Sequence, residues 1–280
     1  MRRRSIGNSE LRNLDPFLMF DHVVLKPPGG FPDHPHRGMT TVSYIHPDSE
    51  GTLMHEDSTG RRGELGAGDV QWMNAGKGVL HAEMPGNGKP MHGFQLWVNL
   101  KVKDKMMPPE YQELLASSIP KAEKDGVWVS VIAGEALGVK AKIFTRTPTH
   151  FLHFILKPGA TINHEIPAMW TAFMYIVKGS GFVGPSSDKQ TIEYKKYYSL
   201  ALGSAGKGSG DGVTVTAGSE GIDFILVAGE PHNEPVVQYG PFVMSSSQEI
   251  EKAFHDFRNA NNGFETANRW ESQIRNRWQN

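Results

Sequence analysis

Short hydrophobic runs, separated by clusters of glycine, proline, aspartate and serine, recur along the first half of the chain. Residues 93–100 show the pattern most clearly, because every second position is a large apolar residue and the positions between them are Gln, Trp and Asn. A period of two is typical of a β-strand with two different faces. Similar runs lie at 41–45, 53–57, 69–73 and 79–84. Short strands at regular spacing predict an all-β sandwich or barrel of the jelly-roll type.

A second set of runs follows a change in composition. Residues 101–126 are rich in charge and proline, and one short helix is predicted near 110–116. The later predicted strands lie at 127–134, 142–148, 151–159, 171–184, 213–218 and 224–231. Their similar number and length suggest a duplicated β-barrel. We therefore predict an N-terminal barrel at 1–118, a linker at 119–126, and a C-terminal barrel with a helical tail at 127–280.

The tail carries a helix signal. Ser246 and Glu249 have the spacing of a capping box. The apolar residues that follow recur at helical spacing: Ile250, Ala253, Phe254 and Phe257. This pattern predicts a helix whose apolar face packs on a barrel, with Gly263 as a stop signal and the remainder to Asn280 as a second short helix or a frayed end.

Four side chains in the first half have the spacing of metal ligands. His34 and His36 are two residues apart, and so are His81 and Glu83. Residues two apart on a strand project from the same face, so each pair is aimed at one point. Three imidazoles and a carboxylate suit iron, manganese, nickel, copper or zinc. Because Pro35 has no N–H to give to a neighbouring strand, the first pair is expected on an edge strand or at a bulge.

A single His-x-His pair is more often two surface histidines, so the prediction depends on the two pairs together. Other histidines lack such a partner: His22, His46, His55 and His92 are expected to be structural or exposed. In the second half, His150 and His153 are three residues apart and His164 and Glu165 are adjacent, so along a strand each pair diverges. The sequence therefore predicts one metal per chain, in the first barrel.

Composition narrows the classes of function. The chain has 280 residues, a hydrophobic content of 38%, a formal net charge of −1 and no cysteine. A near-neutral chain has no basic field to hold a nucleic-acid backbone, so direct nucleic-acid binding is not expected. No run approaches the length of a membrane span, and no apolar segment follows the N-terminal arginines, so an intracellular location in cytoplasm or nucleus is expected. The segment 203–212 does not match a phosphate-binding loop and is predicted to be a hairpin loop.

The chain resembles the pirin family of the cupin superfamily over nearly its whole length. The segments that carry the resemblance include PGGFPDHPHRG at 28–38, GDVQWMNAGKGVLHAEMP at 68–85, HGFQLWVNL at 92–100 and FRNANNGFE at 257–265. The resemblance implies a bicupin, with two antiparallel β-barrels and a C-terminal helical tail. It also implies one iron in the first barrel, bound by His34, His36, His81 and Glu83.

Two positions depart from the general cupin pattern. Met39, Thr40 and Thr41 stand where a glutamate often follows the histidine pair, and Asn74 stands where many cupins have proline. Neither change removes one of the four expected ligands.

Members of this family resemble quercetin 2,3-dioxygenases in activity, and others are nuclear, iron-dependent transcription co-regulators. Four protein ligands on an iron that prefers six leave two positions open, as in a site that binds substrate or oxygen. The resemblance thus favours a dioxygenase that takes a flavonol and dioxygen, with Glu83 as ligand and catalytic proton acceptor. The alternative is a transcription co-regulator whose bound iron controls its binding to transcription factors. A metal-free scaffold is disfavoured because all four ligands are present.

Overall fold

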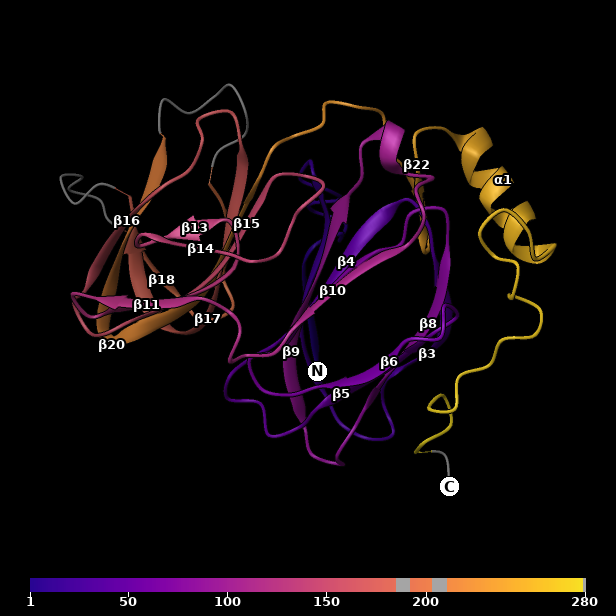
Figure 1. Cartoon of the computed structure of the whole chain (residues 1–280). Coiled ribbons are helices and arrows are strands. Elements are labelled where there is room, and N and C mark those ends of the chain that lie inside the picture. The colour runs from indigo at the N-terminus through magenta and orange to yellow at the C-terminus, as the bar shows by residue number, and fades with distance from the viewer. Residues whose placement is uncertain (185–191, 203–210, 279–280) are drawn as a thin grey trace. The chain divides into compact units, whose positions relative to one another are not determined.

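The computed structural model describes residues 1–184, 192–202 and 211–278, and in these residues the chain is built of β-strands with one α-helix (Figure 1). The all-β prediction is confirmed. The chain forms two compact units: unit 1 contains Met1–Ala116 and His232–Asn280, and unit 2 contains Ser117–Pro231. Most of the hairpin loop predicted at 203–212 lies outside the described residues.

The described part of unit 1 has two large antiparallel sheets and one two-stranded hairpin. The first sheet has six strands in the order β1 (Arg2–Ile6), β2 (Phe17–Leu25), β9 (Met91–Asn99), β4 (Met39–Ile45), β7 (Val70–Asn74) and β10 (Glu110–Leu114). The second sheet has four strands in the order β3 (Phe31–His36), β8 (Val79–Pro85), β5 (Leu53–Asp57) and β6 (Arg62–Leu65). A single turn of 3-10 helix, η1 (Val102–Asp104), follows β9.

The two sheets of unit 1 face each other. Glu83 on β8 of the smaller sheet accepts hydrogen bonds from Ser43 on β4 and Gln95 on β9 of the larger sheet. All residues of β4, β7 and β8 are buried, because side chains of both faces are covered. Their polar residues, such as Ser43, Gln71 and Glu83, are therefore buried along with the apolar ones.

Strand β3 lies at an edge of its sheet, and its register with β8 shifts between Phe31 and His34. Both features agree with the prediction from Pro35. A proline at an edge strand leaves no ladder hydrogen bond unmade.

The predicted helix near 110–116 is wrong. Residues Glu110–Leu114 form β10, which pairs with β7 so that Tyr111 lies opposite Met73. The side chain of Tyr111 packs against a small buried cluster of Met73, Ala75 and Val79. Packing and pairing with an open sheet edge override the local helix preference of this charged segment.

Unit 2 has a sheet of eight strands. Its main path is β11 (Lys121–Lys124), β12 (Val127–Ala133), β15 (Thr149–Leu156), β20 (Gly212–Gly229), β17 (Thr171–Val183) and β18 (Glu193–Lys195). Two more strands extend it, since β16 (Thr161–Glu165) pairs with β20 and β19 (Ser199–Ala201) pairs with β17. A separate hairpin contains β13 (Glu135–Ala136) and β14 (Val139–Lys140). The expected linker at 119–126 is therefore part of unit 2, because β11 pairs with β12.

The C-terminal segment belongs to unit 1, whereas the sequence analysis placed it with the second barrel. It contains the hairpin β21 (Val237–Tyr239) and β22 (Phe242–Met244) and the helix α1 (Ser247–Arg258). The apolar face of α1 packs with Phe242, Phe264 and Leu80 of β8. In Figure 1 this yellow segment runs beside β22, β8 and β3. The helix is apolar on one face only, and the sequence alone did not say which barrel covers that face.

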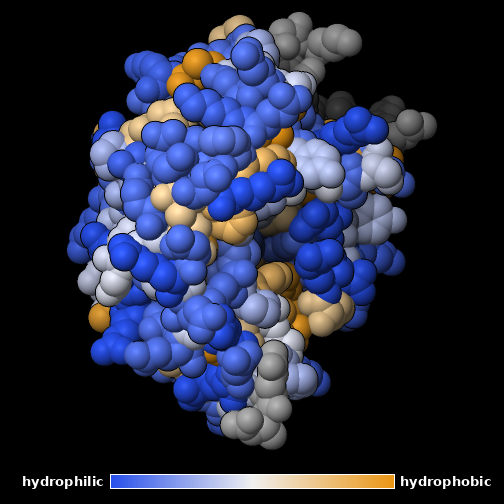
Figure 2. Space-filling view, turned by 90° about the vertical axis from the view of Figure 1, so that its right-hand side faces the viewer, coloured by the Kyte–Doolittle hydropathy of each residue, from blue (hydrophilic) through white to orange (hydrophobic). Residues whose placement is uncertain are grey.

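The start of α1 is as predicted. Ser246 accepts a hydrogen bond from the backbone N–H of Glu249, and the Glu249 carboxylate accepts one from the backbone N–H of Ser245. The helix ends at Arg258, before the predicted stop. On the face shown in Figure 2, hydrophilic side chains predominate and hydrophobic ones form small separate patches.

No helix within the described ranges is both long enough and apolar enough to cross a membrane.

Candidate metal centre

Strands β3 and β8 bring three of the predicted ligands together. The two strands are antiparallel neighbours, and His34 lies directly opposite His81. The ring centroids of His34 and His36 are 4.8 Å apart, those of His34 and His81 4.4 Å, and those of His36 and His81 4.9 Å. One ring nitrogen of each histidine lies within 4.8 Å of those of the other two. Three imidazoles therefore converge, as the two-residue spacing predicts.

The protonation of these imidazoles suits metal binding. His36 and His81 are each 2% exposed, and burial, together with the neighbouring His34, lowers the pKa of both well below the ordinary value. Both rings are therefore neutral at pH 7, which leaves a lone pair for a metal. His34 is half-buried, and its Nδ1 lies 2.7 Å from the backbone carbonyl of Pro32. If Nδ1 donates to that carbonyl, the lone pair of Nε2 points toward His81, whose Nε2 is 2.9 Å away.

One buried polar atom also bears on metal binding. The backbone carbonyl of Pro241 lies near the His36 ring, but Nδ1 of His36 is buried and makes no hydrogen bond of good geometry. Such an atom is costly in a native protein unless a water or an ion satisfies it. The three-histidine cluster therefore fits a transition metal better than it fits a closed hydrogen-bond network.

Glu83 lies two residues beyond His81 on β8 and is 2% exposed. Its Oε1 accepts a hydrogen bond from Ser43 Oγ at 2.7 Å, and its Oε2 accepts one from Gln95 Nε2 at 2.9 Å. It is not part of the compact group of three histidine nitrogens. Both of its oxygens are thus fixed by donors on the facing sheet.

The residues that orient Glu83 were not predicted from the sequence. Gln95 Oε1 accepts a hydrogen bond from Trp97 Nε1 at 3.1 Å, and the Trp97 ring meets the His36 ring edge-on, with centroids 5.1 Å apart. A chain of contacts therefore runs from Glu83 through Gln95 and Trp97 to His36. The sequence does place Gln95 and Trp97 on one face of β9, because they alternate with the apolar residues of that strand. That face lies toward the candidate site.

The turn after His36 is fixed by the C-terminal segment. Gly38 has a φ of +81°, and a Cβ there would lie 2.0 Å from the backbone carbonyl oxygen of Val243. Arg37, 1% exposed, donates to the backbone carbonyls of Lys77 and Asn262 and to the carboxylate of Asp256. The segment that follows unit 2 in the chain thus helps to hold the end of the first ligand strand.

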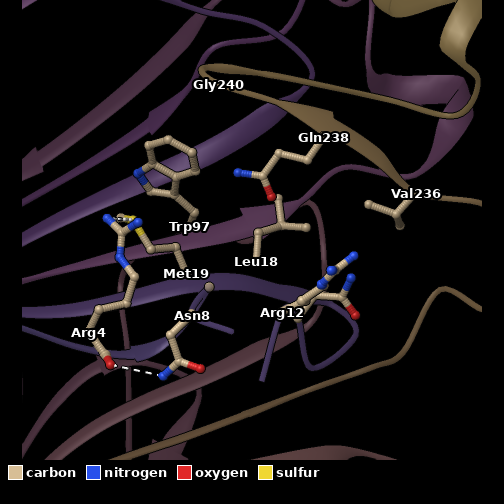
Figure 3. A pocket seen from close by; sticks show the side chains of 11 residues that line it. Arg4, Asn8, Arg12, Leu18, Met19, Trp97, Val236, Gln238 and Gly240 are labelled. Carbon is tan, nitrogen blue, oxygen red and sulfur yellow. Dashed lines mark hydrogen bonds between the residues drawn. The ribbon is translucent and has the colours of Figure 1, made fainter. Parts of the chain in front are cut away.

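Two cavities adjoin these residues. A cavity of about 20 Å³ lies beside Glu83, Ser43 and Gln95, which is room for about one water or one dioxygen molecule. A pocket of about 600 Å³ in unit 1 is lined by residues that include Arg4, Arg12 and Trp97 (Figure 3). In Figure 3 the Arg4 side chain extends toward Met19 and Trp97, and Arg4 Nη2 lies 2.9 Å from Met19 Sδ. Trp97 therefore contacts His36 and also lines this pocket.

Three histidines outside the candidate metal centre form a second cluster in unit 1. His46 Nδ1 lies 2.5 Å and His92 Nδ1 lies 2.6 Å from Asp48 Oδ1, and His22 Nε2 lies 2.7 Å from His92 Nε2. Burial, followed by the neighbouring His92, lowers the pKa of His22 to about 3. Each of these nitrogens has a hydrogen-bond partner within the cluster, and His46, Asp48 and His92 also lie close enough together to hold an ion.

The comparisons with known proteins show the family of the chain. Residues 1–98 match the family described as Pirin, and residues 151–263 match the Pirin C-terminal cupin domain. Pirin from Homo sapiens is 52% identical over 98% of this chain and 92% of its own length, and a pirin-like protein from Solanum lycopersicum is 50% identical over 97% and 90%. The chain therefore belongs to the pirin family of the cupin superfamily.

Solved structures agree with this assignment. A quercetin 2,3-dioxygenase from Acinetobacter baumannii has a TM-score of 0.79 and 30% identity, with 91% of this chain and 89% of that chain covered. A bacterial pirin, YhhW from Escherichia coli in complex with nickel(II), has a TM-score of 0.63 and 18% identity over 82% and 91%, a likeness of fold alone. Two cupin domains on one all-β chain confirm the predicted bicupin.

Proposed function

We propose that the chain is an iron-dependent dioxygenase that cleaves the ring of a flavonol such as quercetin with dioxygen. The observation that carries the proposal is the convergence of His34, His36 and His81, with Glu83 two residues beyond His81 on β8. The likeness to a quercetin 2,3-dioxygenase at 30% identity supports the same class of reaction. The metal, its four ligands and the substrate class are all parts of this proposal.

His34, His36, His81 and Glu83 would hold the iron. When bound, the metal supplies a Lewis acid and open positions for substrate and oxygen. Other divalent transition metals suit the same ligands. The residues of the chain supply the remaining requirements, which are proton transfer, orientation and exclusion of water.

Glu83 would accept the proton of a substrate hydroxyl. A general base must be held within hydrogen-bond reach of the proton that it takes. Ser43 and Gln95 hold the two carboxylate oxygens, and Trp97 holds Gln95. The base is therefore fixed before substrate binds, and little reorganisation is needed when the proton moves.

The cavities constrain where a flavonol can enter. The cavity beside Glu83 holds about 20 Å³, which suits dioxygen or a water but not a three-ring molecule. Among the three histidines, only His34 is partly exposed, since His36 and His81 are buried. We therefore place the substrate on the His34 side, next to β3, which is an edge strand among the described residues.

The test is oxygen uptake by iron-loaded protein with quercetin, recorded with iron content. Wild-type protein should consume oxygen in a quercetin-dependent manner, and His36→Ala should lose both iron and uptake. His255→Ala, at an exposed position of α1, is the matched control and should keep both. Iron-loaded wild-type protein that consumes no oxygen with any flavonol would overturn the proposal.

A second candidate function is a metal-controlled binding module of the co-regulator type, with protein partners such as transcription factors. One observation favours it: Trp97 touches the His36 ring and also lines the pocket that contains Arg4 and Arg12. A change at the metal can thus reach an exposed arginine-bearing surface through one side chain. A partner that binds the iron-loaded form and the metal-free form with equal affinity would exclude this function.

A further inference from the structure

Unit 2 contains two histidines that its own fold brings together. His150 lies near the start of β15 and His164 lies near the end of β16, and both strands pair with β20. Their ring centroids are 5.6 Å apart. His150 is on the same strand face as the core residues Leu152 and Phe154, which are two and four residues further on. His164 is buried and His150 is half-buried, and each ring contacts an aromatic side chain of unit 2.

Neither imidazole satisfies its hydrogen bonds within the protein. Nδ1 of His150 and Nε2 of His164 are both buried and make no hydrogen bond. His164 is 9% exposed, so water does not easily solvate its ring. A buried unpartnered nitrogen requires an explanation, and two of them in adjoining rings point to one shared ligand.

The neighbouring side chains hold both rings in place. Trp170 meets the His150 ring edge-on, with centroids 5.0 Å apart, and Phe154 meets the His164 ring in the same way at 5.8 Å. A Cβ on Gly134 would lie 2.2 Å from the His150 ring. Both rings are thus held by packing, as a preorganised site requires.

An open pocket of about 680 Å³ adjoins the pair, and carboxylates lie around it. The pocket is lined by His150 and His164, by the acidic residues Glu135, Glu165 and Asp211, and by one basic residue, Lys140. Glu135 acts on His150 electrostatically and favours a positive charge there. Burial, the larger effect, lowers the pKa of His150, and burial together with His150 lowers the pKa of His164 to about 4. The two rings are therefore neutral, next to a negatively charged rim that attracts cations.

We propose that His150 and His164 form a second transition-metal site in unit 2, with water completing the coordination and Glu135 attracting the cation from the pocket lining. Imidazole ligands select zinc, nickel, copper or cobalt over magnesium or calcium. Only two nitrogen ligands are in place before binding, against three in the candidate centre of unit 1. The second site should therefore bind metal more weakly. This inference stands independently of the proposed dioxygenase activity, and it replaces the expectation of one metal per chain.

Spacing along a single strand does not reveal this pair. Within their own strands, His150 diverges from His153 and His164 diverges from Glu165. The structure pairs residues from two strands instead.

The experiment is zinc binding to the full iron-loaded chain by equilibrium dialysis, with iron and zinc both measured. Wild-type protein should bind one zinc per chain without loss of iron. His150→Gln and His164→Gln should each raise the zinc dissociation constant at least ten-fold, and Glu135→Gln should raise it less. His255→Gln, at an exposed histidine of α1, is the matched control and should bind as wild type does.

Zinc binding that is unchanged in both His150→Gln and His164→Gln, or that is lost in the His255→Gln control, would overturn the proposal. Since a variant can fail to fold, a second measurement uses wild-type protein only. In NMR spectra, added cobalt(II) should broaden the imidazole resonances of His150 and His164 before that of His255. Broadening of His255 alone would show adventitious surface binding and would likewise overturn the site.

Discussion

Arg37 and Asp256 form a buried ion pair across 219 residues of sequence, with Arg37 Nη1 2.9 Å from Asp256 Oδ2. The side chains are 1% and 2% exposed. Arg37 directly follows His36, and Asp256 lies on α1. The pair therefore connects the first ligand strand to the C-terminal helix, and the candidate centre depends on a segment that is far away in sequence.

Removal of this carboxylate should destabilise unit 1. Asp256→Ala leaves the Arg37 charge buried without its partner, which typically costs about 3–5 kcal/mol. We expect the free energy of unfolding in denaturant to fall by that order, and the iron affinity to fall with it because His36 is adjacent. Glu251→Ala, at an exposed position of the same helix, should change stability by less than about 0.5 kcal/mol. Equal stability of Asp256→Ala and wild type would show that the pair does not anchor the helix.

Removal of metal should lower the melting temperature. A ligand bound only by the native state at a thousand times its dissociation constant adds roughly 4 kcal/mol of stability. Differential scanning calorimetry before and after chelation should therefore show a clear downward shift. His36→Ala provides the control, because its melting curve should respond much less to the chelator. An identical shift in this variant would mean that the stabilising metal binds elsewhere.

Glu83→Gln separates the charge of Glu83 from its position. The amide keeps the size of the side chain and an oxygen that can accept from Ser43, but it lacks the negative charge and basicity. Since general-base catalysis contributes typically about 10²–10⁴-fold, kcat for oxygen uptake with quercetin should fall within that range while part of the iron is retained. Ser43→Ala keeps the carboxylate and should have a smaller effect. A Glu83→Gln protein that keeps its iron and turns over at the wild-type rate would rule out the proton-acceptor role.

His22 should make the fold sensitive to acid. Its folded pKa of about 3 lies below the ordinary value of 6.5, and burial is the main cause. Between these values the unfolded chain binds a proton that the folded chain does not, so stability is present above pH 6.5 and is lost as pH falls toward 3. The loss attributable to one such group is at most about 1.4 kcal/mol per pH unit.

His22→Gln tests this effect, because a Gln amide has no titration in this range. Denaturant unfolding of both proteins at pH 7, 6 and 5 should show a shallower loss of stability in the variant than in wild type. The metal content is measured in parallel, since acid also protonates metal-ligating histidines. Equal pH slopes at equal metal content would contradict the assignment.

Local pattern in the sequence determined much of unit 1. Alternating residues predicted strands such as β9, and the two-residue spacing of His34 with His36 placed both on one face of β3. The capping spacing of Ser246 and Glu249 predicted the start of α1. These features depend on the periods of strands and helices, which are properties of the backbone and need no knowledge of neighbouring elements.

Only the tertiary structure decided which surfaces cover one another. The segment 110–114 formed a strand because β7 offered it an edge, and the apolar face of α1 was covered by Phe242, Phe264 and Leu80 of unit 1 rather than by unit 2. The contacts of Glu83 with Ser43 and Gln95, and the approach of His150 to His164, likewise join side chains on different strands. A local pattern specifies that a face is apolar or that a nitrogen is available, but its partner is selected by packing among all the elements of the fold.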